Sequence, residues 1–116
     1  MELKKINING KDVEFVNTSR GNRSGFVHES VMFVDGCKMS ESKCQYYNRT
    51  WESYCYQSAM QSAVHKLIKS TESYLKERFM QDHQYKKLTD ARKSELEDFY
   101  SSNDDLKFYR AIYSAL

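Results

Sequence analysis

The chain contains no proline and only four glycines among its 116 residues. Without proline, no position removes a backbone hydrogen-bond donor, so long uninterrupted helices and strands are possible. No apolar run reaches the roughly 18 residues that a membrane-spanning helix needs, and no basic segment followed by an apolar one opens the chain. We therefore expect a cytoplasmic protein with neither a membrane span nor a secretory signal.

An excess of charge of one sign is also lacking. Eighteen basic and 16 acidic residues leave a formal net charge of +2. This balance argues against a strongly basic nucleic-acid coat and against a polyanion mimic that acts through its bulk charge. The length suits one buried core and is too short for two ordinary domains, so we predict a single domain over residues 1–116.

Cysteine is scarce, and its spacing is not that of a structural zinc site. Cys37, Cys44, Cys55 and His65 could in principle supply four ligands, but six, ten and nine residues separate them, whereas zinc ligands usually come in close pairs. On the predicted hairpin register, Cys37 and Cys44 also point to opposite sheet faces, because their numbers differ by an odd count. We expect free thiols, no metal and no cofactor.

No catalytic motif is recognisable. His28, His65 and His83 fall in a predicted strand, a predicted helix and a polar segment, and none stands in a local motif that pairs it with a nucleophile. The segment RGNRSG lacks the spacing of a phosphate-binding loop and leads into a strand. We therefore expect that the protein is not an enzyme.

Two dipeptides predict hairpins in the first half of the chain. Asn9-Gly10 and Asp35-Gly36 each stand between alternating segments and suit the positive φ angles of a two-residue turn. The cross-strand pairs that follow are Ile8 with Lys11, Ile6 with Val13, Lys5 with Glu14, Val34 with Cys37, and Met32 with Met39. A four-stranded antiparallel sheet is the simplest result.

Between the hairpins, residues 17–25 (NTSRGNRSG) contain no apolar side chain, which predicts an exposed loop. Arg20 and Arg23 on this loop are candidate partner-binding residues, because a guanidinium group offers planar, bidentate donors to phosphates and carboxylates. A solvated loop without a binding role is the alternative.

From Thr50 the hydrophobic period changes from two to about 3.6 residues and predicts a long amphipathic helix that reaches about residue 80. Trp51 and Cys55 fall roughly opposite its apolar stripe. The members of the stripe are Tyr56, Met60, Ala63, Val64, Leu67, Ile68, Thr71, Tyr74, Leu75 and Phe79.

Two shorter helices follow, the first capped by Thr89 and the second by Ser102 or Asn103. The order of elements predicts an α+β fold: a four-stranded antiparallel sheet of two hairpins, packed by one long helix and two shorter C-terminal helices.

The stretch YYNRTWESYCYQSAM, residues 46–60, has the composition of a contact surface, where Trp, Tyr and Arg are enriched. Its candidate partner-binding residues are Tyr47, Arg49, Trp51 and Tyr54. Helix–sheet packing would bury about half of the rings, which is the competing interpretation. These rings with Arg49 could also stack on single-stranded bases.

Glu95 and Asp98 are further candidate contact residues, because they lie in the acidic segment 94–105 (SELEDFYSSNDD), which has no basic residue. Such a segment could cover a basic groove on a partner. Interaction with helix dipoles and solubility explain it more simply.

Through SGFVHES, VMFVDG and YYNRTWESYCYQSAM, residues 24–60 resemble small proteins carried by phages and mobile elements of Gram-positive bacteria. Some small proteins from such elements are anti-CRISPR inhibitors of the type II (II-A) effector nuclease. The resemblance implies a phage-encoded inhibitor in the host bacterial cytosol that binds the CRISPR effector nuclease or its guide-RNA complex stoichiometrically. The alternative is a small nucleic-acid-binding phage protein that uses the basic loop and the aromatic cluster.

Overall fold

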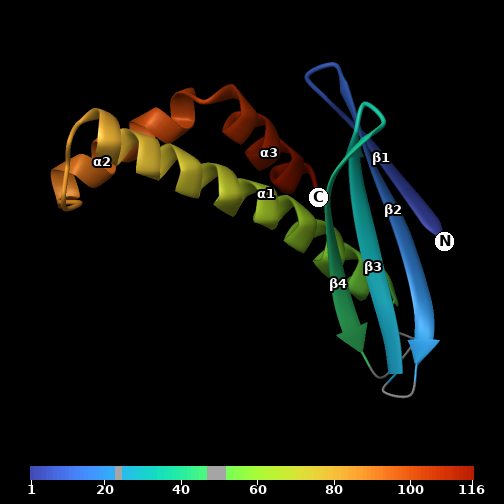
Figure 1. The fold of residues 1–116 in the computed structure, drawn as a ribbon. Helices are drawn as coiled ribbons and strands as arrows, with labels where there is room; N and C mark the ends of the chain where they lie inside the picture. The colour runs from blue at the N-terminus through green and yellow to red at the C-terminus, as the bar shows by residue number, and fades with distance from the viewer. Residues whose placement is uncertain (23–24, 47–51) are drawn as a thin grey trace.

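The computed structural model describes residues 1–22, 25–46 and 52–116 (Figure 1). Its elements are β1 (Glu2–Ile8), β2 (Lys11–Asn22), β3 (Gly25–Val34), β4 (Cys37–Tyr46), α1 (Glu52–Asp82), α2 (Asp90–Ser102) and α3 (Asp104–Ala115). The strands form one antiparallel sheet in the order β1-β2-β3-β4. The predicted α+β fold, with one long helix and two shorter C-terminal helices, is therefore confirmed.

Both predicted hairpin turns are present. Asn9-Gly10 and Asp35-Gly36 have positive φ at all four positions, as a type I′ turn requires. The register of the first hairpin is the predicted one, and the Lys5 ammonium lies 3.7 Å from the Glu14 carboxylate across it.

The second hairpin leaves the predicted register after its second pair, Phe33 with Lys38. Val34 faces Cys37 as expected, but Met32 faces Ser40 and not Met39. The cause is a β-bulge that inserts one extra residue into β4. Because side chains alternate with a period of two, one extra residue exchanges the two faces for the rest of the strand.

The prediction of a loop over residues 17–25 is wrong, because β2 continues to Asn22 and β3 begins at Gly25. Asn17 is fully buried and pairs with Ser30 across the sheet. The continuous backbone ladder between the two strands accommodates polar residues that have low strand propensity by themselves.

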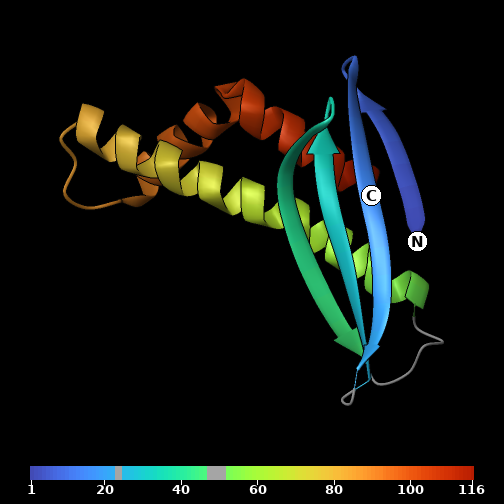
Figure 2. The same ribbon diagram turned by 45° about the vertical axis from the view of Figure 1, so that its right-hand side comes forward.

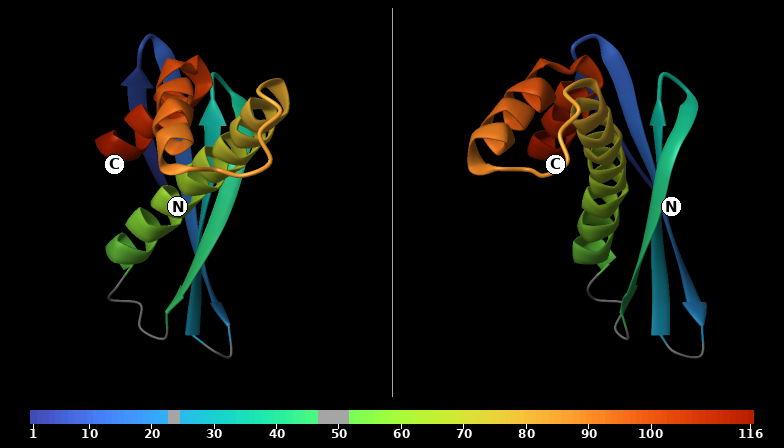
Figure 3. Two further views of the ribbon diagram at one scale, coloured as in Figure 1. Left: turned by 90° about the vertical axis from the view of Figure 1, so that its left-hand side faces the viewer. Right: turned by 60° about the vertical axis from the view of Figure 1, so that its left-hand side comes forward.

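All three helices lie on one side of the sheet (Figures 1 and 3). The long helix α1 crosses that face and extends well beyond it, and α2 and α3 fold back along the protruding part (Figure 2). The radius of gyration is 17.2 Å, against about 13 Å for a compact domain of this length. The molecule is therefore a sheet with a helical arm.

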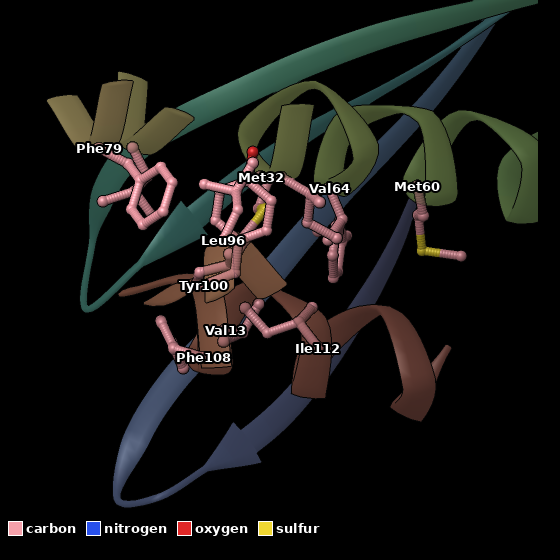
Figure 4. Close-up of a cluster of buried hydrophobic side chains, with 13 residues drawn as sticks. Val13, Met32, Met60, Val64, Phe79, Leu96, Tyr100, Phe108 and Ile112 are labelled. Atoms are coloured by element: carbon pink, nitrogen blue, oxygen red, sulfur yellow. The ribbon is translucent and has the colours of Figure 1, made fainter. Parts of the chain in front are cut away.

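The main hydrophobic core lies where the sheet, α1 and α3 meet (Figure 4). The side chains with at most 1% exposure in this cluster are Val13, Phe15, Met32, Val64, Leu106 and Ile112. Phe79, Leu96 and Tyr100 continue the cluster between α1 and α2. One contiguous core thus joins the sheet to the arm.

The buried side of α1 changes along its length. Cys55 and Ala59 are fully buried, and Tyr56 and Met60 of the predicted stripe are buried as well, so the first turns of α1 are buried on two sides. Tyr74, expected in the stripe, is 59% exposed. The first turns of α1 pack on the sheet and the last turns pack on other helices, so no single stripe describes the whole helix.

The predicted helix caps are confirmed. The Thr89 hydroxyl accepts a hydrogen bond from the Arg92 backbone N–H at 3.4 Å. Asn103 is the residue that caps α3: its side-chain oxygen accepts from the Leu106 backbone N–H at 2.9 Å, and its own N–H donates to the Tyr100 carbonyl. Asn103 therefore ends α2 and starts α3.

Replacing Asn103, the cap that α2 and α3 share, should destabilise the start of α3. We expect Asn103→Ala to lower the free energy of unfolding by about 1 kcal/mol, because the Leu106 N–H loses its acceptor. Urea denaturation followed by circular dichroism measures the change. Ser101→Ala, an exposed position two residues earlier, is the control and should change stability by less than about 0.5 kcal/mol.

Candidate interaction surface

The structure places only part of the predicted contact set. Residues outside the described ranges are Arg23, Tyr47, Arg49 and Trp51, and the side chain of Tyr54 in α1 also lies outside the description. Arg20 is exposed near the end of β2, whereas Glu95 and Asp98 are exposed on α2. These two elements end at opposite parts of the molecule, so the arginine and the two carboxylates do not share a surface (Figure 1).

The sheet face opposite the helices carries an apolar row. Leu3 faces Val16 across β1 and β2, and Val16 faces Val31 across β2 and β3. Leu3 is 49% exposed, and both valines are half-buried. Phe33 and Val27, two and four residues from Val31, lie half-buried on the same face of β3. We call the row Leu3, Val16 and Val31 the outer row.

Ion pairs border the outer row on both sides. The Lys5–Glu14 pair, at 3.7 Å, lies on the side toward the turns, and the Lys43–Glu29 pair, at 3.6 Å, lies on the other. Both pairs are partly exposed, so each contributes at most about 1 kcal/mol to stability. Together they are electrically neutral. An apolar centre within a charged rim is the usual anatomy of a protein–protein interface.

Arg20 lies beside this surface. It borders a shallow hollow of about 300 Å³ together with Thr18, Val27 and Glu29. Thr18 and Glu29 face each other next to the outer row. Among the predicted contact residues whose side chains are described, Arg20 is the one adjacent to the apolar centre.

A second exposed feature is the tip of the helical arm, which aromatic rings hold together. The Phe79 ring centroid lies 4.5 Å from that of His83 and 5.8 Å from that of Phe99. His83 stacks on Tyr85 at 5.2 Å, and the Arg92 guanidinium lies 3.9 Å from the Tyr85 centroid. These contacts position the connection between α1 and α2.

Lys86 and Lys87 in that connection are exposed, and neither has an ion-pair partner among the described residues. They are not among the predicted contact residues. The signal that could have found them is the pair of lysines after Tyr85 between two predicted helices. They form a small cationic patch far from the outer row.

Under the first half of α1, the inner face of the sheet is polar. Asn17, Ser30 and Ser42 form one cross-strand row, and His28 faces Cys44 in a neighbouring row. Asn17, His28 and Ser30 are fully buried, and Ser42 is 7% exposed. We call these five residues the polar layer.

Several atoms of the polar layer lack hydrogen bonds. Among the described residues, the Asn17 side-chain oxygen, both His28 ring nitrogens and the Ser30 hydroxyl have no partner. The Asn17 amide makes only a weak contact, at 3.5 Å, with the Met60 sulfur. Each buried polar group without a partner costs about 1–3 kcal/mol. The layer therefore destabilises this part of the fold.

Small side chains of α1 cover the polar layer. Cys55, Ala59 and Ala63 are fully buried there, which lets the helix approach the strands closely. The Tyr56 ring stands perpendicular to the His28 ring at a centroid distance of 5.5 Å. In the described part of the chain, this edge contact is the ring–ring contact that joins His28 to α1.

The candidate zinc ligands do not gather at one place. Across β3 and β4, Cys37 faces Val34 and Cys44 faces His28. The bulge therefore puts both thiols on the inner face of the sheet, so the prediction that they point to opposite faces is wrong. They remain about 20 Å apart along β4. Cys55 is buried in the first turns of α1, and His65 is exposed farther along the same helix. Within the described ranges, no group of three or more His, Cys, Asp or Glu side chains could hold a metal ion.

Burial first, and then the neighbouring Cys44 thiol, raise the pKa of the Cys55 thiol to about 11. Cys55 is therefore almost wholly protonated at neutral pH. His28 makes no hydrogen bond to either thiol, so the described residues do not form an activated Cys–His pair.

In the described part of the chain, no helix is both long enough and apolar enough to cross a membrane. Comparisons with protein-family models, with curated proteins and with solved structures found no match.

The polar layer yields a prediction about stability. Ser30→Ala removes a buried hydroxyl that has no hydrogen-bond partner, so we expect the free energy of unfolding to rise by about 1 kcal/mol. Chemical denaturation measures it. Ser42→Ala in the same row is the control, because Ser42 borders a surface groove, and it should have little effect. A loss of about 1 kcal/mol in Ser30→Ala would contradict the assignment of an unpaired hydroxyl.

Proposed function

We propose that the chain is a binding protein that acts by stoichiometric contact with another protein, through the outer face of its sheet. The observation that carries this proposal is the outer row, in which Leu3, Val16 and Val31 stay accessible across three strands. An antiparallel sheet with one covered face normally presents polar residues on the other. A row of apolar residues on the uncovered face is typical of a contact surface.

The charges around the outer row favour a protein partner over a nucleic acid. The Lys5–Glu14 and Lys43–Glu29 pairs cancel, and the apolar centre offers nothing to a phosphate backbone. Nucleic-acid binding depends on unneutralised Lys and Arg side chains that replace counterions. A protein surface with an apolar centre and mixed charges at its rim is complementary to this face.

The partner that we propose is a type II CRISPR effector nuclease or its complex with guide RNA. The resemblance of residues 24–60 to small phage and mobile-element proteins, some of which are anti-CRISPR inhibitors, supports this choice. That segment includes β3 and β4 and therefore Val31 and Lys43 of the outer face. Binding would inhibit the nuclease by covering its DNA-recognition surface or by holding it before its conformational step. No bond is made or broken by the inhibitor in this mechanism.

A charge at the centre of the outer row should abolish tight binding. We expect Val31→Lys to weaken binding to the guide-loaded nuclease at least tenfold, because the ammonium would be buried without a partner. Calorimetric titration and a DNA-cleavage assay measure the loss. Ser101→Lys on α2 is the matched control and should bind normally. The thermal midpoint of both variants should stay within a few degrees of the wild type.

A salt titration distinguishes the two classes of partner. The affinity for the protein partner should change little between low and physiological salt, because the rim charges are balanced. Steep salt-dependent binding to a single-stranded oligonucleotide, reduced in the double variant Lys86→Glu, Lys87→Glu and unchanged in Val31→Lys, would instead assign the function to nucleic-acid binding through the arm tip.

A further inference from the structure

The two edges of the sheet differ in how they are protected. At one edge, β4 carries the bulge, and the Lys66 ammonium of α1 donates a hydrogen bond to the Glu41 carbonyl at 2.7 Å. Bulges and lysine side chains both hinder the addition of a further strand. At the other edge, β1 pairs with β2 from Glu2 to Ile8 without a register shift. In the described part of the chain, no strand or helix lies alongside the free side of β1 (Figure 2).

Alternate residues of β1 direct their backbone groups to this free side. The Asp12 carbonyl of β2 accepts a hydrogen bond from the Asp35 N–H at 2.8 Å, and the Asp12 N–H donates to the Asp35 carboxylate at 2.9 Å. Both groups thus point away from β1, so Asn7, which faces Asp12, directs its own N–H and carbonyl away from β2. Because this direction alternates along an antiparallel strand, Leu3 and Lys5 do the same.

We propose that β1 pairs with β1 of a second copy of the chain, antiparallel and about a two-fold axis at Leu3. The two sheets then form one continuous sheet, and the outward backbone groups of Leu3 bond to those of Leu3 in the other copy. An isologous contact of this kind uses the same surface on both copies. The surface must therefore be complementary to itself.

The charges of β1 select the register. Facing residues must both direct their backbone groups toward the other copy or both away from it, so the axis lies at one residue of β1. An axis at Lys4 or Lys5 would place two ammonium groups opposite each other, and an axis at Glu2 would oppose two carboxylates. An axis at Ile6 would leave Lys4 opposite an isoleucine. An axis at Leu3 places each Glu2 opposite Lys4 of the other copy.

Glu2 and Lys4 have no ion-pair partner among the described residues, whereas the neighbouring Lys5 pairs with Glu14. They lie two residues apart and therefore on the same face of β1. In the proposed register they form a non-hydrogen-bonded pair, in which facing side chains are closest. The two-fold axis makes this contact twice, so the second copy supplies both missing partners.

The pairing also extends the outer face. Leu3, which is 49% exposed in the single chain, lies beside Leu3 of the other copy. The two outer rows then join into one, with Val16 and Val31 of each copy following outward from the axis. Because only residues 1–5 of each copy pair, the contact is smaller than a permanent interface, and we expect a dimer that dissociates on dilution.

The test is sedimentation equilibrium of the full chain in reducing buffer, from low micromolar to millimolar concentration. We expect a monomer–dimer equilibrium. Glu2→Lys and Lys4→Glu each place like charges opposite each other and should raise the dissociation constant about tenfold. The double variant Glu2→Lys, Lys4→Glu exchanges the two charges and should restore the dimer. Ser101→Lys on α2 is the control and should dimerise normally, and circular dichroism checks the fold of every variant.

Hydrogen exchange measured by NMR tests the register itself. The Leu3 N–H should become protected as the concentration rises and the dimer forms. The Asn7 N–H also points outward but lies beyond the paired residues, so its exchange should not change. Protection of Asn7 without protection of Leu3 would contradict the axis at Leu3.

A wild-type chain that stays monomeric at millimolar concentration would overturn the proposal and leave this edge to a different protein. A dimer that both single charge reversals leave intact, or that the double variant fails to restore, would overturn it as well. Dimerisation is measured without the nuclease, and Val31→Lys, two strands away from β1, should not change it. The result is therefore separate from that of the proposed function.

Discussion

The packing of α1 across one face of the sheet is the interaction on which the rest of the structure depends. Its first turns cover the strands with small side chains, and its middle contributes Val64 to the core shared with α3. Its last turns leave the sheet and carry α2 (Figure 2). One helix on one face necessarily leaves the other face uncovered, so the same packing creates both the arm and the outer surface.

The two halves of this helix–sheet contact differ in energy. Where Phe15 and Met32 meet Val64, burial of apolar surface stabilises the fold by roughly 25 cal/mol per Å². Where Asn17 and His28 lie under α1, unpaired polar atoms offset part of that gain. The start of α1 is thus the less strongly held end, and local opening is expected to begin there rather than at the core.

Local signals predicted much of the fold and less of the candidate site. The turns at Asn9-Gly10 and Asp35-Gly36 and the caps at Thr89 and Asn103 depend on neighbours within a few residues, and all four are observed. The outer row was not identified, because alternation along a strand reveals two faces without saying which one a helix will cover. The bulge in β4 is likewise invisible to a pattern that assumes strict alternation.

The sequence by itself determined the order of four strands and three helices, since turn chemistry, capping and hydrophobic period all act over a few residues. Only the tertiary structure decided that β2 and β3 extend through a polar segment and which side of α1 is buried at each turn. It also decided that His28, which faces Cys44, packs against Tyr56 of α1. Those features depend on contacts between residues far apart in the chain, and the free energy of such contacts comes from packing that no local pattern encodes.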